Sequence, residues 1–87
     1  MNITAPTVHL NGTSYKDLYA GYEAAYEAVR AAQEALGNIE FNSRDYYVQS
    51  PEAWSNAVDH RIEQKTALLQ VEEYLLQHLI ALQNQKK

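Results

Sequence analysis

Apolar residues recur between residues 15 and 36 at alternating spacings of three and four, which predicts an amphipathic helix. The pattern keeps one narrow apolar seam over three heptads, which is typical of a helix that packs along a partner helix. Ser14 is a favourable N-cap, and Gly37-Asn38 is a favourable stop. The expected seam residues are Tyr15, Leu18, Tyr22, Ala25, Val29, Ala32 and Leu36.

A second helix is predicted over residues 51–83, with Ser50 as its N-cap and Pro51 at its first position. No Gly or Pro follows Pro51, which favours one long helix, and the alternative is a break near Thr66 that would give three helices. In its second half, apolar residues cover about half of the circumference, more than one partner helix buries. These residues are Leu68, Leu69, Val71, Leu75, Leu76, Leu79, Ile80 and Leu82.

The remaining segments predict an arm and a loop. Residues 1–14 read as an extended arm, because Pro6 disfavours helix before it and Asn11-Gly12 is a turn signal. Residues 37–50 form a loop that is longer than the two to eight residues usual between packed helices. The sequence therefore predicts one all-α domain over residues 1–87, a long antiparallel helical hairpin with an extended N-terminal arm.

The unequal lengths of the two helices predict which residues lie level with one another and leave the last turns of the second helix uncovered by the first. We expect Leu36 to lie near Trp54 and Tyr15 near Leu75, with the last turns of the second helix extending past the first. Both the arm, through Ile3, Val8 and Leu10, and a second subunit are expected to cover those turns. A chain of 87 residues without Cys has no disulfide to stabilise it, which also favours a homo-oligomer.

Composition narrows the function. With 7 basic and 11 acidic residues the net charge is −4, which argues against general nucleic-acid binding. The absence of Cys excludes thiolate metal sites and cysteine nucleophiles. No signal-peptide pattern opens the chain, and no apolar run approaches the roughly 20 residues that span a bilayer. We expect a soluble cytoplasmic protein without a membrane partner.

A first candidate site lies where the second helix meets the loop. Arg61 and Lys65 are one turn apart on the inward face of that helix, and Arg44 lies in the loop. The loop also carries Tyr46 and Tyr47, and cations beside aromatic rings are what a nucleotide-like anion needs.

A structural reading of the same charges stays open. Lys65 would then pair with Glu72, Arg44 with its neighbour Asp45, and Arg61 would extend to solvent.

A second candidate anion site precedes the first helix. His9, Asn11, Thr13 and Ser14 surround the free backbone amides of its N-terminus. The alternative is a capped helix behind a turn, with no ligand. The two candidate sites are roughly 30 Å apart along the first helix, so they form one site only between subunits.

Other residues predict structure rather than chemistry. The tyrosines at positions 15, 19, 22 and 26 form a ladder that is expected in a core or an interface. His60 and His78 are too far apart along one helix to share an ion, and no motif for a metal, a cofactor or a nucleophile is present. We expect a protein that is not an enzyme and has no cofactor.

The stretches TVHLNGTS (residues 7–14) and NSRDYY (residues 42–47) resemble short helical proteins of phages and prophages. That resemblance implies a protein acting inside a bacterial cell. The helical-hairpin architecture also looks like that of phage nucleotide sponges, small oligomers that sequester the nucleotide signals of antiphage defence. This second likeness is an analogy of size, architecture and origin.

These observations predict a sponge that binds a cyclic oligonucleotide or an ADP-ribose derivative. One alternative is a protein-interaction module that blocks a host defence effector, and another is a structural coiled-coil component.

Overall fold

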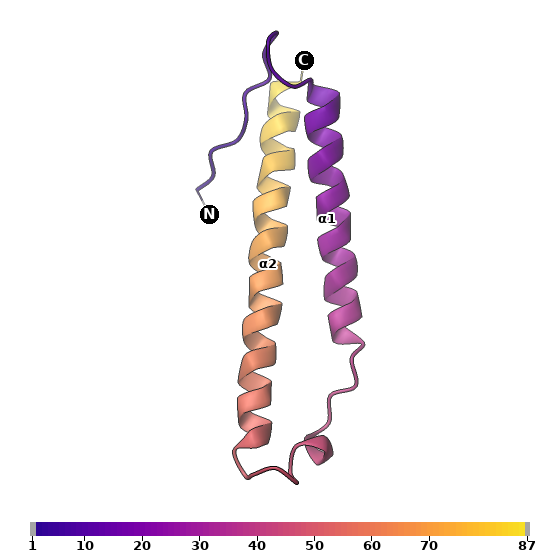
Figure 1. Cartoon of the computed structure of the whole chain (residues 1–87). Coiled ribbons are helices and arrows are strands. Elements are labelled where there is room, and N and C mark those ends of the chain that lie inside the picture. Colours follow the sequence, from indigo (N-terminus) through magenta and orange to yellow (C-terminus); the bar gives the residue numbers. More distant parts are fainter. Residues whose placement is uncertain (1, 87) are drawn as a thin grey trace.

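The computed structural model describes residues 2–86. It contains α1 (Tyr15–Gly37), a short 3-10 helix η1 (Ser43–Asp45) and α2 (Ala53–Gln85), and no strand within the described residues. α2 lies alongside α1, and the N-terminal arm lies beside the C-terminal part of α2 (Figure 1). The predicted all-helical fold is confirmed.

The molecule is elongated. Its extents are 61 × 23 × 17 Å, and its radius of gyration is 18.7 Å. A compact domain of this length would have a radius of gyration of about 12 Å. Two helices side by side therefore leave most residues with solvent on at least one side.

The helix ends follow the sequence signals in part. The Ser14 hydroxyl accepts the Asp17 N–H at 3.1 Å, which confirms Ser14 as the N-cap of α1. The predicted N-cap of α2 is wrong, because α2 begins at Ala53 and its N-cap is Glu52. The carbonyl of Ser50, rather than its hydroxyl, accepts the Ala53 N–H at 3.3 Å, so the chain makes a turn there before the helix starts.

The predicted register between the helices is wrong. Tyr15 lies near Lys86, whose Nζ is 5.6 Å from the tyrosine ring centroid, and not near Leu75. At the other end, the Leu36 carbonyl contacts Arg61 instead of lying near Trp54. The pairing is thus shifted by about three helical turns, so the last turns of α2 pack against the first turns of α1. The first turns of α2 extend past α1 and are covered by the loop.

The core is small and lies near the C-terminal end of α2. Leu75, His78, Leu79 and Leu82 are the buried side chains within residues 2–86. His78 stacks on Tyr22 of α1 at 4.6 Å between ring centroids, and its Nδ1 is 2.8 Å from the Tyr74 carbonyl oxygen. A histidine thus fills a core position that the sequence analysis gave to aliphatic residues.

The seam of α1 is only half-buried, since no residue of this helix is fully buried. The predicted seam residues are half-buried with one exception, Ala32, which is exposed. Gln33 takes its place and donates from Nε2 to the Leu68 carbonyl at 3.4 Å. A straight helix drifts by about 20° per heptad against a strict seven-residue repeat, which brings position 33 inward.

The arm covers part of α2 as predicted. The Gln85 side chain donates to the Pro6 carbonyl at 2.9 Å and accepts the Val8 N–H at 2.8 Å. Ile3 is half-buried and lines a hollow on α2 beside Ile80. The expectation for Leu10 is wrong, because the turn that follows His9 carries its side chain into solvent and leaves it 98% exposed.

We predict that Leu82→Ala lowers the free energy of unfolding by about 2–4 kcal/mol, because it opens a cavity at a side chain with 0% exposure. The matched control, Leu10→Ala, makes the same truncation at a solvent-exposed side chain. It should change the free energy of unfolding by less than about 0.5 kcal/mol. Urea denaturation followed by circular dichroism measures both. Equal losses for the two variants would contradict the assigned core.

Candidate functional site

Three aromatic rings pack together where the loop meets the first turns of α2. Phe41 lies 4.6 Å from Trp54 and 5.7 Å from Tyr46, and Tyr46 lies 5.6 Å from Trp54, between ring centroids. The η1 turn places Tyr46, because the Tyr46 N–H donates to the Ser43 carbonyl at 3.0 Å. We call Phe41, Tyr46 and Trp54 the tip cluster. It covers the part of α2 that α1 does not reach.

Arg61 joins the tip cluster to the end of α1. Its Nη2 donates to the Leu36 carbonyl at 3.0 Å, and its Cζ lies 4.6 Å from the centroid of the Phe41 ring. The Leu36 carbonyl also accepts the Ile39 N–H at 3.3 Å, and carbonyls at a helix C-terminus carry partial negative charge, so a guanidinium is favourable there. The Arg61 side chain is half-buried, and its guanidinium is engaged by the fold.

A shallow groove of about 390 Å³ opens beside Arg61. Most of its walls are apolar or aromatic, and polar groups stand at its edge. The residues around it are Leu36, Ile39, Glu40, Phe41, Tyr46, Ala57, His60, Arg61 and Gln64. A guanidinium has five N–H donors, and the bond to the Leu36 carbonyl uses one of them. The groove thus combines a fixed cation with an aromatic wall.

The other predicted residues of this end lie around the groove without lining it. Arg44 is exposed on η1. Tyr47 is exposed, and its hydroxyl accepts a hydrogen bond from the Ser43 hydroxyl at 2.9 Å. Lys65 is exposed and lines a separate hollow of about 220 Å³ against the last turn of α1. The structure therefore brings Tyr46 and Arg61 together and leaves Arg44, Tyr47 and Lys65 outside the groove.

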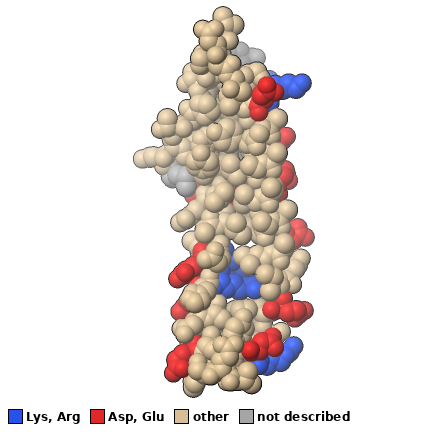
Figure 2. Space-filling view, in the orientation of Figure 1, with Lys and Arg blue, Asp and Glu red and all other residues tan. Residues whose placement is uncertain are grey.

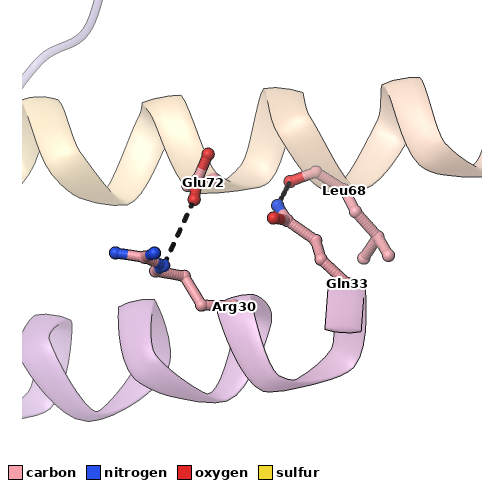
Figure 3. Close-up of polar contacts among 4 residues, drawn as sticks. All are labelled: Arg30, Gln33, Leu68 and Glu72. Carbon is pink, nitrogen blue, oxygen red and sulfur yellow. Dashed lines mark hydrogen bonds and ion pairs between the residues drawn. The ribbon is translucent and has the colours of Figure 1, made fainter. Parts of the chain in front are cut away.

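The ion pairs of the structural reading are wrong. Glu72 lies beside Arg30 of α1, with 3.9 Å between the Arg30 Nε and the carboxylate, next to the Gln33–Leu68 hydrogen bond (Figure 3). Within residues 2–86, Lys65 makes no pair with Glu72 and Arg44 makes none with Asp45. In the lower half of the face shown in Figure 2, Lys and Arg side chains lie between the two helices, with acidic side chains on both sides.

The arm residues form no site with this groove in one chain. His9, Asn11 and Thr13 are exposed, and the Ser14 hydroxyl is engaged in capping α1. A turn closes this segment, since the Gly12 N–H donates to the His9 carbonyl at 3.1 Å. These four residues precede α1, whereas the groove lies at the other end of α1, beside Leu36 and the loop.

Phe41 lines the groove and was not among the candidate residues of the sequence analysis. Its ring contacts both the tip cluster and the Arg61 guanidinium. An aromatic residue in a long polar loop is the signal that could have identified it.

We predict that Arg61→Met lowers the free energy of unfolding by about 1–2 kcal/mol, because it keeps the packed stem but removes the bond to Leu36 and the contact with Phe41. Arg44→Met is the matched control at an exposed site and should stay within about 0.5 kcal/mol. The fluorescence of Trp54, the single tryptophan, follows unfolding in urea. Equal losses in the free energy of unfolding for Arg61→Met and Arg44→Met would contradict the role assigned to Arg61.

Residues 2–86 contain neither a candidate metal site nor a candidate membrane-spanning helix. No group of three or more His, Asp or Glu side chains is placed to hold a metal ion. Neither helix in this range is apolar enough over a sufficient length to cross a membrane. Comparison with protein-family models, with curated proteins and with solved structures finds no match to this chain.

Proposed function

We propose that this chain is a non-enzymatic binding protein that sequesters a small anionic nucleotide, as an antiparallel helical hairpin assembled into a homo-oligomer. One observation carries the proposal: the Arg61 guanidinium is held over the Phe41 ring at the edge of a groove. Arginine recognises phosphate through directed N–H donors, and the Tyr46 ring offers a face to a base.

The size of the groove supports a small ligand, and its lining carries one cation, Arg61, and one carboxylate, Glu40. A volume of about 390 Å³ falls at the lower end of the range of small-molecule sites, about 300–1,000 Å³. Arg44 on η1 supplies a further cation at the same end of an otherwise acidic chain. An open groove excludes little water, which suits capture of a ligand better than catalysis on it.

The resemblance to phage proteins adds a cellular setting and a ligand class to the proposal. It rests on residues 7–14 and 42–47, which precede α1 and surround η1. In this proposal the protein acts in the cytoplasm of a bacterial host, and its ligand is a cyclic oligonucleotide or an ADP-ribose derivative used as an immune signal. Tight binding and slow release would then determine its effect.

A second candidate function is a protein-interaction module that blocks a host defence effector. The observation that favours it is the row of exposed aliphatic side chains on α2, which includes Ile62, Leu69 and Ile80. An apolar face of this kind binds a protein partner.

Native mass spectrometry and isothermal titration calorimetry test the nucleotide proposal, with a panel of cyclic dinucleotides, cyclic trinucleotides and ADP-ribose. We expect one ligand class to bind, and Arg44→Ala and Arg61→Gln to weaken it by about 10-fold or more, because each removes a charged donor. The control Arg30→Gln removes an exposed charge from the part of α1 between its two ends and should leave affinity within about 2-fold.

Circular dichroism and Trp54 fluorescence check that each variant keeps the fold. Because Arg44 is exposed, its variant separates lost binding from lost structure. The absence of any bound mass at about 100 μM of each nucleotide would overturn the proposal. It would mean that the binding free energy is weaker than about −5.5 kcal/mol, too weak for sequestration. Binding that survives both arginine variants would overturn the assigned site.

A further inference from the structure

A row of exposed aliphatic side chains runs along one flank of α2, beside its seam with α1. Leu69 borders a hollow with Leu36 of α1, and Ile80 borders another with Ile3 of the arm. Ile62, Leu69, Leu76 and Ile80 are 40–56% exposed. The first three are spaced by seven residues, so they lie on one face of the helix, each about 10 Å beyond the last. We call these four residues the outer strip. A strip with heptad spacing is the seam that a further helix packs against.

The exposed surface of the chain is large enough for such a partner. Its accessible area is 6535 Å². A folded monomer of 9.9 kDa would have about 5,200 Å². The excess is larger than the roughly 800 Å² that each partner contributes to a standard stable interface.

We propose that the outer strip packs against the outer strip of a second copy, with the two α2 helices running in opposite directions and Leu69 at the two-fold axis. α2 runs from Ala53 to Gln85, so Leu69 is its midpoint and this pairing overlaps the helices along their whole length. Ile62 of one copy then lies level with Leu76 of the other.

The charges next to the strip determine the direction. Lys65 lies four residues before Leu69, and Glu72 and Glu73 lie three and four residues after it. Opposite directions place Lys65 of each copy level with the acidic pair of the other copy. A parallel pair would place like charges level, which is unfavourable.

This pairing makes a composite site. Gln85 holds the arm at the end of α2, and the tip cluster packs on Trp54 at its start. Opposite directions bring these two ends together, so residues 9–14 of one copy lie at the same end of the pair as η1 and Trp54 of the other, with Arg61 about 12 Å further along the helix. Within one chain the two sets are at opposite ends of α1. The composite site rests on the proposed nucleotide function, whereas the pairing of the strips does not.

Single-cysteine variants test the pairing, since the chain has no Cys of its own. A disulfide forms only where the two Cα atoms come within about 7 Å. We expect Leu69→Cys to cross-link with itself at least 10-fold faster than the control Val71→Cys, an exposed position on another face of α2. Ile62→Cys should cross-link when mixed with Leu76→Cys, and neither should cross-link alone.

Self-linking of Ile62→Cys and of Leu76→Cys would show a parallel pair and overturn the proposal. The proposal would also be overturned if no variant cross-linked faster than the Val71→Cys control and sedimentation equilibrium showed a monomer at about 100 μM. The outer strip would then be free for another partner.

Leu69→Lys places two like charges at the two-fold axis and should weaken the dimer at least 10-fold. The control Val71→Lys should leave it unchanged. Nucleotide titrations of the same samples separate the proposals. A dimer that binds no nucleotide refutes the proposed function alone, and a monomer that binds nucleotide refutes the pairing alone.

Discussion

Two helices packed side by side have one seam in which to bury apolar side chains, and every other feature of this molecule depends on that limit. The fully buried side chains of residues 2–86 all lie between Leu75 and Leu82. The rest of α2 is covered by short segments, with the arm held by Gln85 at one end and the tip cluster at the other. The outer strip lies on its remaining flank, where Ile3 of the arm lies beside Ile80 and the other three side chains of the strip are exposed.

Sequence patterns predicted the helices well because their signals are local. The heptad spacing of α1, the Ser14 cap and the lack of a helix breaker after Pro51 act within a few turns. The register was mispredicted because a shift of about eleven residues is close to three whole helical turns and leaves the same faces in contact. Tertiary contacts, such as the packing of the loop on Trp54, distinguish the two registers.

For the candidate site, the types of residue that gather there were easier to predict than the contacts those side chains make within the fold. Arg61 and Tyr46 do meet at one groove. Whether a side chain is already used by the fold depends on contacts between distant segments, as for Arg61 on the Leu36 carbonyl. His78 shows the same limit: a polar residue becomes a core residue because Tyr22 of the other helix stacks on it. Such partners have no local signal.

The central claim is that the folded unit is a pair of chains, and the thermal unfolding midpoint as a function of protein concentration tests it most directly. For a unit of two chains, stability coupled to association rises by about 2.7 kcal/mol of dimer, or about 1.4 kcal/mol per chain, for a 100-fold rise in concentration. From about 1 to about 100 μM, circular dichroism should therefore show the midpoint rising by roughly 5–10 °C. A midpoint that stays constant over this range would contradict the claim, because it would show that a single chain folds without a partner.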